Sequence, residues 1–124
     1  MKIKTSELTR HALDWAVCVA AGWAPTVRSK VECQNELTTP VFLGDQEQRP
    51  STDWAQGGPI IERGRIQLRI DEAGNNFAVV WLRNIGYGPR IEGPTPLIAA
   101  MRCYVMSKLG DEVDVPDGLM EEVK

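Results

Sequence analysis

Two separate segments of the chain hold the residues whose types and spacing suit the binding of an anion. The first segment consists of Ser51, Thr52, Asp53, Trp54, Gln56, Gly57 and Gly58. Its hydroxyl and carboxylate side chains are typical of a helix start, and its glycine pair would let the backbone approach a phosphate. The second segment runs from Tyr87 to Arg102 and contains Arg90 and a Thr95–Pro96 helix start. Two helix N-termini with one or two arginines predict a site for a phosphate or a carboxylate.

Each of these segments also contributes one aromatic residue in polar, glycine-rich surroundings, namely Trp54 and Tyr87. Such a residue is a candidate for stacking on a base or for contacting a subunit, and a local lid over the core is an equally good interpretation. Close helix packing explains the glycine pair as well as a phosphate does, because no GxGxxG or GxxxxGK[ST] motif is present. Trp15 and Trp81 fall on faces that we predict to be buried, so we interpret both as core residues.

Enzymatic chemistry finds less support in the sequence. His11 is the single histidine, with Asp14 three residues and Cys18 seven residues further on. Seven residues are about two helical turns, roughly 10 Å of rise, so His11 and Cys18 cannot touch. We therefore interpret His11 as a surface histidine beside an acid. An enzyme would have to use Asp53 or Glu62, but a helix cap explains Asp53 better, and nothing supplies a base, a nucleophile and an oxyanion site together.

The composition is that of one ordinary globular domain. The chain has 124 residues, of which 43% are hydrophobic and 25% charged, which is enough for one core. Residues 111–124 carry six acids and one lysine, so the net charge of -3 leaves +2 for residues 1–110. We expect a single domain over 1–110 and an acidic tail over 111–124. A body this weakly basic disfavours a nucleic-acid partner, since such proteins carry dense Lys/Arg clusters.

The cysteines and the hydropathy exclude further classes of protein. Cys18, Cys33 and Cys103 are odd in number and have no CxxC or Cys/His spacing. They predict neither a disulfide framework nor a zinc site, and we expect no metal and no cofactor. No apolar run approaches the roughly 20 residues that span a bilayer, and the N-terminus lacks a secretory apolar stretch. We expect no membrane contact and a cytoplasmic location.

Hydrophobic periodicity predicts the elements before residue 50. Apolar residues from Leu8 to Trp23 recur at spacings of three and four, which indicates a helix. Thr5 or Ser6 is its expected cap and Gly22 its expected end. After it, Val27, Val31 and Cys33 alternate with polar residues as an edge strand does, and residues 35–50 are polar and turn-rich.

The second half of the chain predicts a hairpin between two helices. A capped turn at residues 51–53 leads to a short helix starting near Pro59, because a proline inside a helix costs about 3 kcal/mol. Residues 66–70 alternate and residues 77–82 are continuously apolar, so they predict two strands paired in a hairpin over 65–83. A last helix follows Thr95–Pro96 and stops at Gly110. The fold class is therefore α+β, a small antiparallel sheet of about three strands packed against three helices.

Three stretches of the sequence carry a resemblance to known proteins: MKIKTSELT..ALDWAV at the start, PSTDWAQGGPIIER in the centre and GPTPLIAAMRCYVMSKLGDEVDVP at the end. They resemble the NinX family of lambdoid phages over most of the chain. The order of Ala21–Gly22–Trp23, Pro50 to Asp53 and Thr95–Pro96 is also similar to the phage ABA-sandwich domain, from which Gly57–Gly58–Pro59 departs. The resemblance implies helices around a small sheet and a phage accessory protein in the host cytoplasm. It implies no activity.

Taken together, these patterns favour a non-enzymatic protein that binds a small anionic, nucleotide-like ligand. Trp54 or Tyr87 would stack, while Arg90, Arg102 and the backbone of residues 51–58 would hold phosphate. The alternatives are an adaptor or inhibitor that binds a host protein through the acidic tail, and an enzyme acting on nucleotides. A homo-oligomer is expected in each case, because a thin sheet in so short a chain needs more cover than its own helices give.

Overall fold

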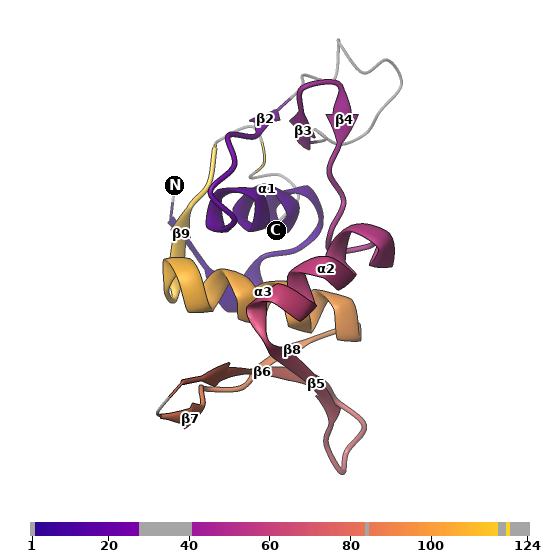
Figure 1. The fold of residues 1–124 in the computed structure, drawn as a ribbon, viewed down its shortest axis with the longest axis vertical. Coiled ribbons are helices and arrows are strands. Elements are labelled where there is room, and N and C mark those ends of the chain that lie inside the picture. Colours follow the sequence, from indigo (N-terminus) through magenta and orange to yellow (C-terminus); the bar gives the residue numbers. More distant parts are fainter. Residues whose placement is uncertain (1, 28–40, 84, 117–118, 120–124) are drawn as a thin grey trace.

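The computed structural model describes residues 2–27, 41–83, 85–116 and 119 of the chain (Figure 1). Within them lie the helices α1 (Arg10–Ala20), α2 (Trp54–Gly64) and α3 (Pro96–Leu109) and the 3-10 turn η1 (Thr5–Glu7). The strands are β1 (Lys2–Lys4), β2 (Thr26–Val27), β3 (Val41–Leu43), β4 (Gln46–Glu47), β5 (Ile66–Ile70), β6 (Asn76–Leu82), β7 (Gly86–Tyr87), β8 (Ile91–Gly93) and β9 (Glu112–Asp114). This confirms the predicted α+β class. No helix among the described residues is long and apolar enough to cross a membrane.

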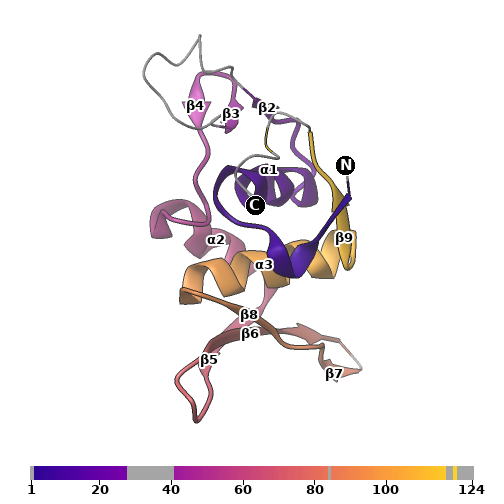
Figure 2. The same cartoon turned by 180° about the vertical axis from the view of Figure 1, so that it is seen from behind.

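Helix α3 is the centre of the fold. It separates α1 from the sheet formed by β5, β6, β7 and β8, as the two opposite views in Figures 1 and 2 show. Every residue from Ala99 to Val105 is buried, so this helix is covered all round, as expected for a core helix. Gly93 of β8 permits the close approach of the sheet, because a Cβ there would lie 2.6 Å from the backbone nitrogen of Ala99.

The predicted hairpin over residues 65–83 is confirmed. β5 pairs with β6 along its whole length, from Ile66 opposite Val80 to Ile70 opposite Asn76, and the other edge of β6 pairs with β7 and β8. Only one face of this sheet lies against α3, however, and Trp81 on the opposite face is 43% exposed. The prediction that Trp81 is a core residue, and that its strand is covered on both faces, is therefore wrong.

The sequence predicted the C-terminal end of α1 correctly but not its N-terminal cap. Its N-cap is Thr9, and the predicted caps Thr5 and Ser6 lie instead in η1. The Thr5 hydroxyl donates to the carbonyl of Gly110 at 2.7 Å, so this side chain is bonded to a distant segment and does not cap α1. The predicted end is confirmed, because Gly22 has φ +84° and its own N–H bonds back to Val19 at 3.0 Å.

Helix α2 begins at Trp54, five residues before the predicted start, and Pro59 lies inside it. The carboxylate of Asp53 accepts the N–H of Ala55 at 2.9 Å and fixes this earlier start. Gly57 then contacts the adjoining structure directly, since a Cβ there would lie 2.6 Å from Cδ1 of Leu97 on α3. The cap and the packing of α2 on α3 together outweigh the cost of an internal proline.

The folded domain extends beyond the boundary expected at residue 110. β9 pairs antiparallel with β1, and the side chains of Val113, Val115 and Leu119 are buried. The first acids of the predicted tail, between Asp111 and Asp114, are thus part of the fold. Residues 117–118 and 120–124, and the strand predicted around Val31 and Cys33, lie outside the described residues.

Candidate functional site

The backbone of residues 51–58 has little left to offer a phosphate. The N–H groups that already donate to a carbonyl or carboxylate oxygen of the protein are those of Ser51, Thr52, Asp53, Ala55, Gln56 and Gly57. Gly57 is buried against the carbonyl of Pro50, which lies 2.5 Å from where a Cβ would be. The glycine therefore serves close packing, which is the alternative to a phosphate cradle that the sequence also allowed.

Ser51 belongs to a buried joint between α1 and the start of α2. Its N–H donates to Oδ1 of Asp14 at 2.8 Å, and the other carboxylate oxygen of Asp14 lies 3.7 Å from Nδ1 of His11. Asp14 is 1% exposed, so the predicted surface pair of His11 and an acid is in fact a buried contact. Burial raises the pKa of the nearby Cys18 thiol to about 12, with the charge of Asp14 adding to the shift. The joint is structural and holds no activated nucleophile.

Trp54 and Tyr87 are both exposed, as predicted, but they lie on different elements. Trp54 begins α2, whereas Tyr87 lies on β7 in the sheet. Gln56 is bound from both sides, because its Oε1 accepts the N–H of Arg49 and its Nε2 donates to the carbonyl of Glu47. Thr95 caps α3 by accepting the N–H of Ile98 at 3.1 Å. The structure thus does not bring the predicted stacking residues into one site.

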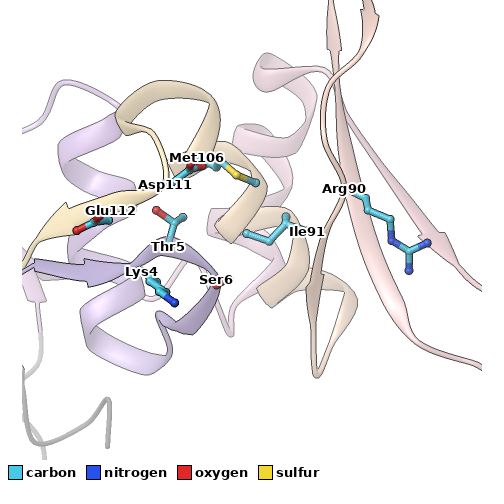
Figure 3. Close-up of a pocket in the computed structure, with 8 residues that line it drawn as sticks. All are labelled: Lys4, Thr5, Ser6, Arg90, Ile91, Met106, Asp111 and Glu112. Atoms are coloured by element: carbon cyan, nitrogen blue, oxygen red, sulfur yellow. The ribbon is translucent and has the colours of Figure 1, made fainter.

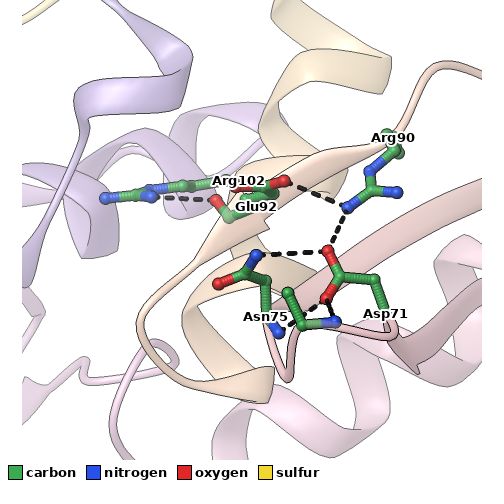
Figure 4. A network of polar contacts seen from close by, with 6 residues as sticks. Asp71, Asn75, Arg90, Glu92 and Arg102 are labelled. Carbon is green, nitrogen blue, oxygen red and sulfur yellow. Dashed lines mark hydrogen bonds and ion pairs between the residues drawn. The ribbon is translucent and has the colours of Figure 1, made fainter.

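Arg90 is already neutralised on the sheet. Its Nη2 lies 3.0 Å from carboxylate oxygens of both Asp71 and Glu92, and its guanidinium covers the ring of Phe77 at 3.9 Å (Figure 4). The pKa of Asp71 is lowered, first by the backbone N–H of Asn75 and then by Arg90. Two carboxylates would repel a phosphate at this arginine, so its surroundings do not favour the predicted role of Arg90 in phosphate binding.

Arg102 differs from Arg90 in its exposure and in its hydrogen-bond partners. It is 8% exposed, and its Nε donates to the carbonyl of Leu8 at 2.8 Å while Nη1 donates to the carbonyl of Glu92 at 2.9 Å. A guanidinium has five N–H donors, so these two bonds leave some of them unused. In the part of the chain that the structure describes, no carboxylate forms an ion pair with it. Burial lowers its pKa, which reflects the cost of holding this charge away from water.

Arg102 lines a pocket of about 400 Å³ where η1, the β5–β6 turn and β8 meet. The other residues that line it are Ser6, Asn75, Asn76, Glu92, Gly93 and Pro94. A neighbouring pocket of about 290 Å³ shares Ser6 and is lined further by Lys4, Thr5, Arg90, Ile91, Met106, Asp111 and Glu112 (Figure 3). The side chain of Arg90 extends away from the others in that view, so the second pocket is lined chiefly by the N-terminal and C-terminal segments.

Of the predicted site residues, Arg102 alone lines either pocket with an unneutralised charge. Ser6, Asn75, Asn76 and Pro94 also line the pocket, although the sequence patterns did not single them out as site residues. The adjacent amides at 75 and 76 were the available signal, because asparagine side chains carry both a hydrogen-bond donor and an acceptor. The position of η1 had no signal, since the bond that holds it joins residues 94 apart in the chain.

The comparisons with known proteins identify a family. The family model described as "Bacteriophage P22, NinX" matches residues 4–108, a range that includes every residue lining the Arg102 pocket. Among curated proteins, none matches the chain.

Proposed function

The chain belongs to the NinX family of bacteriophage P22, and from this premise we propose that it is a phage accessory protein that binds a small anionic ligand at Arg102 without transforming it. The observation that carries the proposal is the buried guanidinium, which has two carbonyl acceptors and no carboxylate partner among the described residues. The ligand would occupy the pocket of about 400 Å³ beside it.

The energetics of a buried charge support an anionic ligand. Burying an ion is costly unless it is paired, and each bond between a charged donor and a neutral carbonyl offsets only part of that cost. A phosphate or carboxylate would accept the remaining N–H groups and supply the missing opposite charge, often through two parallel bonds. Arg102 is also held rigidly by its bonds to Leu8 and Glu92, so little side-chain entropy is lost on binding.

The remaining lining residues favour a nucleotide-like ligand over a bare anion. The pocket volume falls within the usual range of roughly 300–1,000 Å³ for small-molecule sites. The amide nitrogens of Asn75 and Asn76 donate to Asp71 and to the carbonyl of Pro94, which leaves their amide oxygens as acceptors. A base with an exocyclic amino group offers the matching donors, while its phosphate suits Arg102.

The lining residues support binding rather than turnover. The set contains no histidine, cysteine or lysine, and its one carboxylate, Glu92, is bonded to Arg90. General acid–base catalysis needs a titratable group within hydrogen-bond reach of the substrate and with a pKa near the working pH. Asp53, one of the two carboxylates that an enzyme would have had to use, caps α2.

Ser6 provides the test, because it is exposed, lines the pocket and can be changed without removing a bond that the structure shows. We expect mono-, di- or cyclic nucleotides to raise the melting temperature of the wild-type protein. Ser6→Asp would place a negative charge beside the ligand and weaken binding about tenfold or more, equivalent to about 1.4 kcal/mol. Ser6→Asn has nearly the same size and no charge, so binding should persist. Absence of any shift across the panel, or equal affinity in both variants, would refute the proposal.

A further inference from the structure

One face of the sheet, which we call the outer sheet face, is turned away from α3. Strand pairing places together on it Gln67 and Arg69 of β5, Phe77, Val79 and Trp81 of β6, Tyr87 of β7 and Glu92 of β8. In Figures 1 and 2, α3 and the other labelled helices all lie on the opposite side of the sheet. Among the described residues, no element covers the outer sheet face.

The side chains on this face form a continuous chain of rings and guanidinium groups. The guanidinium of Arg69 lies 5.0 Å from the centre of the Tyr87 ring. The rings of Tyr87 and Trp81 meet edge to face, with their centres 5.0 Å apart. Trp, Tyr and Arg are the residues that most often dominate the energy of protein–protein interfaces. The outer sheet face therefore has the composition of an interface centre.

Exposed apolar surface is concentrated in the same part of the molecule. Besides Trp81 and Tyr87, which are 43% and 45% exposed, Ile70 is 68% and Ile85 is 79% exposed. Ile70 ends β5 and Ile85 lies in the turn between β6 and β7, and Figure 1 shows these hairpin ends projecting from the helices. Ile85 therefore extends the exposed apolar surface beside Trp81 and Tyr87, whereas Ile70 shares the register of Ile66 and Leu68 and lies on the side of the sheet toward α3. Exposed apolar residues that lie together mark an interaction surface rather than ordinary surface scatter.

The charges on and beside the face indicate which partner fits. Arg69 bonds to the neutral side chain of Gln67 at 2.9 Å, whereas Asp71 and Glu92 share the single cation Arg90. One unneutralised arginine therefore faces outward near two acids that share one positive charge. A two-fold axis through the face would bring Arg69 of each copy toward Asp71 or Glu92 of the other, which is the self-complementarity that an isologous dimer requires.

A single-stranded nucleic acid fits the same face less well. Bases stack on open ring faces, but Arg90 lies over the ring of Phe77 and Arg69 over that of Tyr87. A phosphate approaching Arg90 would also meet two carboxylates. Of the three rings on this face, only Trp81 has no guanidinium over it among the described contacts, and the surroundings of Arg90 hold no surplus of positive charge.

We infer that the outer sheet face binds a second copy of this chain, forming a two-fold dimer in which the sheets pack face to face. Trp81 and Tyr87 lie in this interface, Ile85 lies beside them in the turn between β6 and β7, and Arg69 reaches a carboxylate of the other copy. Such an interface needs about 800 Å² from each partner, roughly a tenth of the surface of a small protein. The chain exposes 7282 Å², so an interface of about 800 Å² would cover roughly a tenth of its surface.

The test is the mass in solution over a range of concentrations, measured by native mass spectrometry and sedimentation velocity. The wild-type protein should be a dimer of twice 13.8 kDa. Trp81→Ser should raise the dimer dissociation constant about 30-fold or more, as loss of an interface hot spot does. Trp54→Ser is the matched control, since Trp54 is a comparably exposed tryptophan on α2 and should leave the dimer intact.

A charge exchange distinguishes a docking contact from a folding defect. Arg69→Glu alone should weaken the dimer, and combining it with Glu92→Arg should restore dimerisation, because the pair is then reversed across the interface. A wild-type monomer at all concentrations would overturn the inference, as would a dimer insensitive to both Trp81→Ser and Arg69→Glu. Quenching of Trp81 fluorescence by single-stranded oligonucleotides bound to a monomer would overturn it too, and would assign the face to nucleic acid.

Discussion

The adjacent glycines Gly57 and Gly58 make a matched experiment within a single helix. An alanine at 57 would place its Cβ 2.5 Å from the carbonyl oxygen of Pro50 and 2.6 Å from Cδ1 of Leu97. Ordinary contact begins at 3.4 Å, so the Pro50 oxygen is about 0.9 Å too close, and backbone cannot rotate away as a side chain end can. An alanine at 58 would meet nothing within 4 Å apart from its own chain neighbours, one of which is Pro59.

Gly57→Ala should be the less stable of the two variants. Replacing a helical glycine with alanine gains about 0.8–1 kcal/mol of helix propensity. Overpacking costs about 1–3 kcal/mol and applies only at 57. At 58 the gain is reduced, because a residue with a Cβ that precedes a proline is disfavoured in helical backbone, and Pro59 follows. We expect Gly57→Ala to destabilise the fold by about 0–2 kcal/mol and Gly58→Ala to change its stability by less than about 1 kcal/mol, so the difference reports chiefly the packing of α2.

Urea unfolding followed by far-ultraviolet circular dichroism measures this difference, and each kcal/mol corresponds to about 3–5 °C in melting temperature for a chain of this size. Equal stability of the two variants would refute the packing of α2 on α3 described above. Loss of nucleotide binding in both variants, without a change in stability, would instead support the phosphate cradle that the sequence predicted for this glycine pair.

Three other predictions follow from the titratable groups and the helix cap. Burial raises the pKa of Cys18 from 9.0 to about 12 and that of Cys103 from 9.0 to about 11. The stabilisation that the two protonated thiols provide is therefore complete below pH 9 and is lost as the pH rises through the raised pKa values. A variant with both cysteines changed to alanine should lose this part of the alkaline slope in urea unfolding. The pKa of Asp71 is lowered, first by the backbone N–H of Asn75, so this carboxylate should stay ionised below pH 3.8. The stabilisation that it provides should be lost only as the pH falls through the lowered pKa. A carboxyl chemical shift of Asp71 that titrates at or above pH 3.8 would contradict this. Asp53→Ala should cost about 1 kcal/mol in urea unfolding, whereas Asp53→Asn should cost much less because asparagine also caps.

The pocket and the outer sheet face are connected through β8. The carbonyl oxygen of Glu92 accepts a hydrogen bond from Arg102, and its carboxylate accepts one from Arg90, as Figure 4 shows. An arginine of a second copy that binds the Glu92 carboxylate would therefore affect β8, the strand whose Glu92 carbonyl accepts a hydrogen bond from Arg102. Ligand affinity measured above and below the dimer dissociation constant is the direct measure of any such coupling.

Local chemistry in the sequence was sufficient for several elements. Thr95 and Pro96 fix the start of α3 and Gly110 its end, because capping bonds and the fixed φ of proline act within a few residues. Gly22 ends α1 for the same reason, and the alternation of residues 66–70 encodes a strand with one buried face. The family resemblance was likewise carried by the sequence alone, and the match over residues 4–108 confirms it.

Tertiary packing decided the rest. The continuation of α2 through Pro59 is supported by its packing on Leu97, and the exposure of Trp81 depends on which face of the sheet α3 covers. The groups that surround each arginine come from segments far away in the chain. Arg90 and Arg102 look alike in the sequence, yet one is paired with Asp71 and Glu92 while the other is bound by carbonyls of Leu8 and Glu92. Periodicity encodes which residues share a face of one element, but the partner that covers that face is set by the packing of elements distant in sequence.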